Sequence, residues 1–236
     1  ETLIRKDFSL KIGATFKRLN MYASSPSLVT TFQDVKYQIV ESDFSSTNAT
    51  LKYDTLDDVF FPSSGFLFEG SGDLYLTGSK YDNFSQFLIL KANIAKAFSI
   101  NDRISILAGT EGGFMVGDDK ISALHFGLGG YAHNHLNNYS SFFGYDFFSL
   151  TGNSFVKAYF SADYEFYKRH HINISGNFTN IGNDIFLEKE WFTLPSYKGF
   201  AIGYGLETIF GPIELKFHWS PENDYSGAFV NLGYWF

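Results

Sequence analysis

Apolar and polar residues alternate with a period of two along most of the chain. In the segment 153–166, the even positions from Val156 to Phe166 are apolar, whereas the odd positions from Lys157 to Glu165 are mostly polar. The same alternation recurs at 8–17, 34–39, 66–76, 88–94, 104–108, 171–179, 200–208 and 213–219. Short alternating segments separated by turns indicate antiparallel strands with one polar and one apolar face.

The apolar face of such strands can lie against the core of a soluble β-sandwich or against lipid. Here the polar faces carry charges of both signs, and Phe, Tyr and Trp gather at the strand ends of the apolar faces. Rings at these positions are typical of the aromatic girdles of membrane barrels. In lipid the sheet must close, because an open edge leaves backbone groups unpaired. The pattern favours an all-β fold, a transmembrane antiparallel up-and-down β-barrel.

The turns divide the chain into about eleven strands, and because bacterial barrels usually have an even number we expect about twelve. The stretches where a strand is hardest to place are 18–30, 121–131 and 185–193. Short connections are predicted at 61–65, 99–102, 167–170 and 210–212, and long ones at 18–27, 115–151 and 181–198. We interpret 115–151 as a long external loop that can fold into the lumen.

Composition supports one membrane-embedded domain over residues 1–236. Aromatic residues make up 19% of the chain, yet no run approaches the ~18 apolar residues of a transmembrane helix. The net charge of −7 without a basic patch argues against a nucleic-acid partner. The chain has no Cys, which excludes disulfides and thiolate chemistry, and it begins at Glu1 without Met, so we expect a mature or trimmed form.

The polar faces place charged residues where they would line the lumen. Buried charges are costly unless they are paired, so we expect opposite charges to pair across a narrow lumen and to plug it. The predicted luminal polar network consists of Lys157, Asp163, Glu165, Glu207, Glu214, Lys216 and His218.

The C-terminus ends in an aromatic residue with apolar residues at every second position before it. This amphipathic strand is similar to the signal that the barrel-assembly machinery reads, and its residues are Val230, Leu232, Tyr234 and Phe236.

Candidate catalytic residues are few. Gly70-Ser71-Gly72 is a fragment of the Gly-x-Ser-x-Gly elbow, but the alternation places it mid-strand. The long loop holds His125, His133 and His135 near Ser122, Ser140 and Ser141. We interpret these as polar loop residues, and we interpret His170 and His171 as part of a solvated turn. No catalytic residue, metal site or cofactor is predicted.

Three stretches resemble the BamA-like superfamily of outer-membrane assembly and translocation barrels, in particular the barrels attached to patatin-like phospholipases. The first is Tyr53-Asp54-Thr55-Leu56-Asp57-Asp58 with Phe60-Phe61-Pro62 and Gly65. The second is Gly203-Tyr204-Gly205 leading to Phe210-Gly211-Pro212-Ile213. The third, similar to the family's lid loop, comprises 126–130, Phe143-Gly144-Tyr145 and 150–153.

The resemblance implies a protein of the Gram-negative outer membrane that acts as a membrane anchor, or as a non-canonical assembly or lipid-perturbing barrel, without a catalytic site of its own. The implied partners are outer-membrane lipids, the barrel-assembly machinery and a second copy of the chain. The chain departs from the family where Phe143 replaces the Arg of the lid motif. Two alternatives remain open: a small barrel enzyme of the phospholipase or lipid A deacylase type, using His133 or His135, and a passive pore.

Overall fold

The computed structural model describes residues 2–5, 7–25, 35–79, 84–117, 121–131 and 138–233. Its main feature is one antiparallel sheet of eleven strands in which each strand pairs with its neighbour in the sheet order β1 to β6 and then β10 to β14. The strands are β1 (Thr2–Arg5), β2 (Phe8–Ser25), β3 (Val35–Asp54), β4 (Gly65–Gly78), β5 (Phe87–Asn101), β6 (Ile104–Val116), β10 (Ser154–Tyr167), β11 (His170–Gly182), β12 (Tyr197–Thr208), β13 (Gly211–Ser220) and β14 (Asn223–Leu232).

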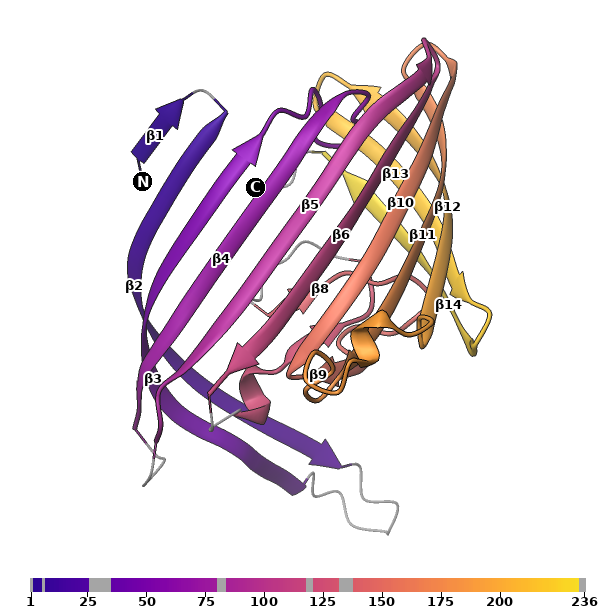
Figure 1. Ribbon diagram of the computed structural model, residues 1–236. Coiled ribbons are helices and arrows are strands. Elements are labelled where there is room, and N and C mark those ends of the chain that lie inside the picture. The colour runs from indigo at the N-terminus through magenta and orange to yellow at the C-terminus, as the bar shows by residue number, and fades with distance from the viewer. Residues whose placement is uncertain are drawn as a thin grey trace.

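The sheet is strongly curved, and its last strands turn back behind its middle (Figure 1). The fold is therefore all-β with up-and-down connectivity, as the alternation predicts. Among the described residues, β1 and β14 each pair with a single neighbour, so the sheet is not closed by hydrogen bonds between its first and last strands. In the same part of the chain, no helix is long and apolar enough to cross a membrane.

Among the described residues the sheet has eleven strands, and the three doubtful stretches add none to it, so the expected twelve are not confirmed. The segment 18–25, predicted as part of a loop, instead prolongs β2, and its backbone continues to pair with β3 through one irregularity between Met21 and Tyr22. Backbone pairing along a hairpin does not need alternating side chains, which explains why the sequence pattern missed it.

The other two doubtful stretches lie outside the large sheet. The first holds the 3₁₀ helix η1 (Ser122–Leu124) and β7 (Phe126–Leu128). Strand β7 forms a separate three-stranded sheet with β8 (Tyr139–Ser140) and β9 (Leu150–Gly152). The second holds the 3₁₀ helix η2 (Glu190–Phe192).

The two ends of the sheet differ in the length of their connections. At the upper end in Figure 1 lie the connection between β1 and β2, three two-residue turns at 102–103, 168–169 and 209–210, and the connection 55–64. We call this the turn end. The opposite end, the loop end, carries the longer connections 117–153 and 183–196, and also the two-residue turn 221–222 between β13 and β14. Predicted short and long connections thus separate onto opposite ends.

The two faces of β11 and β13 have the reverse of the polarity of a soluble protein. On β11 and β13 the buried residues are polar, including His171, Asn173, Glu214 and Lys216, whereas their apolar neighbours point outward. Ile174 is 54% exposed and Leu215 is 50% exposed. We call the face with buried polar residues the inner face and the opposite one the outer face.

The connection 117–153 covers the inner face. Its described part, residues 121–131 and 138–153, is called the inner loop below. Rings of the inner loop pack with rings of the sheet, as in the edge-to-face contact of Phe126 with Phe155 on β10. A side chain at Gly113 on β6 would approach the Phe126 ring to 2.6 Å, so glycine permits this close contact. The buried core of the molecule therefore lies between the sheet and its own loop.

Candidate functional site

A buried ion pair joins the sheet to the inner loop. Lys157 on β10 lies directly opposite Glu111 on β6, and the Lys157 Nζ and Glu111 Oε2 atoms are 2.5 Å apart. Ser140 Oγ of the inner loop accepts a hydrogen bond from Lys157 Nζ at 2.5 Å and donates one to Glu111 Oε2 at 2.7 Å. The Lys157 ammonium also donates to the Ser141 carbonyl at 3.2 Å. Each charge is thus satisfied by its counter-ion and by the loop.

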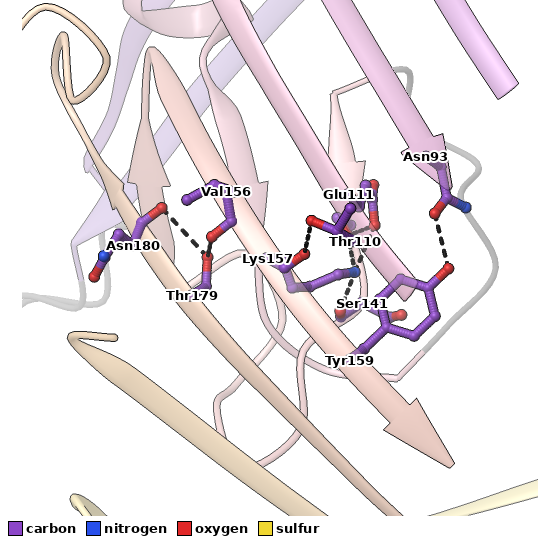
Figure 2. A network of polar contacts seen from close by, with 10 residues as sticks. Asn93, Thr110, Glu111, Ser141, Val156, Lys157, Tyr159, Thr179 and Asn180 are labelled. Carbon is purple, nitrogen blue, oxygen red and sulfur yellow. Dashed lines mark hydrogen bonds and ion pairs between the residues drawn. The ribbon is translucent and has the colours of Figure 1, made fainter. Parts of the chain in front are cut away.

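Further polar contacts surround this pair (Figure 2). Tyr159 donates to Asn93 Oδ1 at 2.8 Å, which links β10 to β5 across β6. Thr110 Oγ1 donates to the Lys157 carbonyl at 3.1 Å. On the other side of β10, Thr179 Oγ1 donates to the Val156 carbonyl at 2.8 Å. The network spans four neighbouring strands, so the Lys157 side chain projects from a part of the sheet that side-chain hydrogen bonds hold rigid.

A second contact between sheet and inner loop is built on β13. Lys216 Nζ lies 3.3 Å from Glu214 Oε1 and donates to Tyr131 Oη of the inner loop at 2.9 Å. The same ammonium lies 4.7 Å from the centre of the Tyr131 ring, a cation–π distance. Glu214 and Lys216 are both buried, and Tyr131 stacks on Phe143.

The motif Phe143-Gly144-Tyr145 lies against β12 and β13. The Gly144 amide donates to His218 Nδ1 at 2.9 Å. Gly144 has a φ of +75°, and a Cβ there would collide with the backbone of Trp219 and Ser220. Glycine at this position therefore permits both the turn and the approach to the sheet. Phe143 is buried, and its carbonyl lies against Gly199.

A third group lies at the turn end, away from the inner loop. His171 Nδ1 and Asp163 Oδ2 are 2.6 Å apart, and His171 Nε2 lies 3.3 Å from Glu207 Oε1. Glu165 accepts a hydrogen bond from the Arg169 amide at 2.8 Å. His171, expected in a solvated turn, is buried, because it is the first inner-face position of β11 after the turn residues.

The predicted luminal network therefore forms three separate groups. Lys157 belongs to the first, Glu214, Lys216 and His218 to the second, and Asp163, Glu165 and Glu207 to the third. The expectation that charges pair across the lumen is wrong for Lys157 and Lys216, whose carboxylate partners are on the adjacent strand and on the same strand. The inner loop fills the space between the walls, so opposite walls do not meet there.

Sequence reasoning did not single out Glu111 or Tyr131, and it missed the roles of Ser140 and His171, which it interpreted as a polar loop residue and as part of a solvated turn. The pairing of Glu111 with Lys157 could have been predicted only from the register of β6 against β10. The connection 117–153 separates these two strands in the sequence. His171 carried a usable signal, since it follows the alternation of 171–179 on the polar side.

The C-terminal residues are only partly described. Val230 and Leu232 lie on the outer face of β14 and are 58% and 73% exposed. Tyr234 and Phe236 lie outside the described residues, as do His133 and His135.

The structure describes the surroundings of two candidate serines. Ser71 lies within β4 and not on a strand-to-helix turn. Ser140 Oγ accepts a hydrogen bond from Lys157 Nζ, which is also paired with Glu111. Within the described ranges, no group of three His, Cys, Asp or Glu residues could hold a metal ion.

Known proteins share this fold. The crystal structure of BamA from Haemophilus ducreyi lacking POTRA domains 1–3 superposes with a TM-score of 0.66 at 14% sequence identity, over 97% of this chain and 50% of that one. The chain thus spans about half the length of that structure. No curated protein matches the sequence. The family model of the OMP85 superfamily matches residues 1–236, the whole of the chain, and this protein therefore belongs to the OMP85 superfamily.

Proposed function

We propose that the chain forms a closed, plugged β-barrel in the outer membrane of a Gram-negative bacterium, where it serves as a membrane anchor without a catalytic site of its own. The inverted polarity of the sheet carries this proposal. The side chains of Lys157 and His171 are buried on the inner face, whereas Phe217 and Ile202 are exposed on the outer face. Only an apolar solvent makes that arrangement favourable over the reverse.

Aromatic residues at both ends of the outer face support membrane insertion. The turn end carries the exposed aromatic residues Tyr53, Phe66, Phe98, Phe166, Tyr204 and Phe210. At the loop end the exposed rings are Phe114, Trp191, Phe192 and Trp219. The band between them is mainly aliphatic and includes Ile94, Ile202 and Leu215, with Phe217 opposite Ile202. Two girdles around an aliphatic band match the two interfaces and the hydrocarbon core of a bilayer.

The lengths of the connections give the orientation. Outer-membrane barrels have short periplasmic turns and longer extracellular loops, so the turn end faces the periplasm in this proposal. The inner loop then enters the lumen from the cell exterior and acts as the plug.

The proposed anchoring role rests on the resemblance to barrels attached to patatin-like phospholipases. Ser140, the buried serine next to a lysine, binds the loop to the sheet. An activity of the whole protein would then be supplied by a further domain, as the resemblance suggests.

A second candidate function is assembly through the open edges of the sheet. Among the described residues, β14 pairs only with β13, and most of β2 has one partner, β3. An unpaired edge can accept a strand from another chain, either a client or a second copy.

One experiment tests both candidates in outer-membrane fractions of cells that produce the full protein. The chain has no Cys, so cysteines introduced at outer-face positions Ile12 of β2 and Val230 of β14 can be cross-linked specifically. A cross-link within one chain, from a heat-modifiable protein in the outer membrane, supports the closed anchor. The pair Ile94→Cys with Val230→Cys is the control, since β5 lies in the middle of the sheet.

Cross-links between chains would instead favour the second candidate. Recovery of the protein in the soluble fraction would reject membrane insertion altogether. A native mass far above the 26.7 kDa of this chain would show that it anchors a larger protein.

A further inference from the structure

One of the contacts that dock the inner loop onto the sheet uses a histidine ring. His218 on β13 is 4% exposed, and its Nδ1 atom accepts a hydrogen bond from the Gly144 amide at 2.9 Å. An amide N–H can only donate, so Nδ1 must keep its lone pair and the proton of the neutral ring must lie on Nε2. The contact therefore requires a single tautomer of the neutral imidazole.

The sheet and the inner loop hold the His218 ring in place. Its partners on the neighbouring strands are the small residues Ala201 on β12 and Gly227 on β14. A Cβ at Gly227 would lie 2.7 Å from His218 Nε2, so glycine leaves room for that side of the ring. The rings of Tyr225 and Phe143 pack around it at centroid distances of 5.9 Å and 6.2 Å. This packing keeps Nδ1 directed at the inner loop.

The charged groups around His218 pair with one another and not with the histidine. The titratable groups on β12, β13 and β14, in the turn 221–222 and in the inner loop that surround it are Lys198, Glu214, Lys216, Glu222, Tyr131, Tyr145 and Tyr225. Lys216 pairs with Glu214, and Lys198 pairs with Glu222. In the described part of the chain, no carboxylate forms an ion pair with His218, so a charged ring would have no counter-ion there.

We infer that His218 is a pH-sensitive latch, and that protonation of its Nδ1 releases the segment Phe143-Gly144-Tyr145 from β13. The added proton occupies the lone pair that binds the Gly144 amide, so two N–H donors then face each other. The docked segment excludes this proton, whereas the histidine of the undocked state accepts it. Acid therefore shifts the equilibrium toward the undocked segment. Docking is strongest above the ordinary histidine range near pH ~6.5 and weakens below it.

This inference deepens the proposed function, and only its physiological consequence rests on that proposal. The loop end faces the cell exterior in the proposed orientation, so external acid would loosen the plug. The docking contact itself belongs to the folded chain. It can therefore be measured in detergent micelles, whether or not the protein forms a closed barrel in a membrane.

The test is amide hydrogen exchange of the full protein in detergent micelles at pH of about 7.5 and about 5.5, with each rate divided by the intrinsic rate at that pH. We expect the protection of peptides within 139–148 to fall about tenfold at the lower pH, as one histidine that titrates near pH ~6.5 allows. His218→Asn retains an acceptor in Asn Oδ1 but does not titrate, so its protection should be equal at both pH values.

Two further variants complete the comparison. His218→Phe has no acceptor for the Gly144 amide, and its inner loop should be poorly protected at both pH values. His125→Asn removes the histidine of the inner loop itself and should keep the pH dependence of the wild type. Nitrogen-15 NMR of the histidine-labelled wild type needs no substitution. It should show His218 at pH of about 7.5 with its proton on Nε2 and none on Nδ1.

Three results would overturn the inference: a proton on His218 Nδ1 at the higher pH, wild-type protection that is equal at both pH values, or a pH dependence that persists in His218→Asn. Recovery of the protein in the soluble fraction, together with protection that falls in acid and is pH-independent in His218→Asn, would support the latch and reject the proposed membrane function. The two failures are thus distinguishable.

Discussion

At the scale of residues, Lys157 and Glu111 show how a charge is accommodated on the inner face. The Lys157 side chain is 6% exposed and that of Glu111 is 19% exposed, so neither ion is well hydrated. Removal of one partner leaves the other as an unpaired charge. We expect Lys157→Met to destabilise the protein by roughly 3 to 5 kcal/mol, measured by denaturant unfolding in detergent. Glu111→Gln should also destabilise the protein, because it leaves the Lys157 ammonium without its counter-ion.

The double variant Lys157→Met with Glu111→Gln is the control for this prediction. It removes both charges, so its cost should be smaller than the sum of the single costs by about 1 kcal/mol or more. Strictly additive costs would show that the two charges contribute independently, and would contradict the ion pair as the cause.

Asp57 gives a second prediction at this scale, for pH. Burial acts to raise the pKa of Asp57, but hydrogen bonds from Ser63 Oγ and from the Ser63 and Ser64 amides outweigh it and lower the pKa from 3.8 to about 2. A pKa lowered in the folded state stabilises the protein above the unfolded pKa. This contribution is complete above pH 4 and is lost as the pH falls toward 2.

The stability difference between the wild type and Asp57→Asn should therefore shrink over that range. Carboxyl-carbon NMR titration of Asp57 provides the direct measurement, and a midpoint at the ordinary value would refute the prediction. Asp102→Asn, in the neighbouring turn between β5 and β6, is the matched charge control.

At the scale of elements, the strands that alternation predicts best are those with a polar face on the inner side and lipid-type residues on the outer side. Strands β10, β11 and β13 meet that condition and were located almost to their ends. The end of β2 does not, because Lys17 and Arg18 are consecutive polar residues, so the alternation of 8–17 is interrupted there. Its pairing with β3 depends on backbone hydrogen bonds, which leave no mark on side-chain identity.

The same distinction applies to the candidate site. Alternation predicted which face Lys157, Glu214 and Lys216 occupy, because the face of a residue depends on local sequence alone. It could not predict their partners in the inner loop, Ser140 and Tyr131, because those contacts depend on how the 117–153 connection folds back. Register between distant segments is set by packing, and a single sequence shows it poorly.

At the scale of the whole molecule, the inner loop takes the place that solvent or a second sheet would take in other β-proteins. The side chains of Phe126, Leu128 and Phe142 form one buried cluster with Phe44 and other inner-face residues. In the closed barrel proposed above, an interior filled in this way would not conduct freely, whereas the same barrel without its plug would.

We therefore expect the intact protein to show no large open-channel conductance in planar bilayers. Replacing residues 121–149 with a short Gly/Ser linker should raise the conductance roughly tenfold or more, because it removes the packed interior while leaving the strands in place. Gly144→Val is the milder variant, since a side chain there collides with the backbone of β13 and displaces the loop locally. It should produce brief openings on a closed background. A wide conductance in the intact protein, or a closed state that survives the deletion in a heat-modifiable barrel, would show that the inner loop is not the plug.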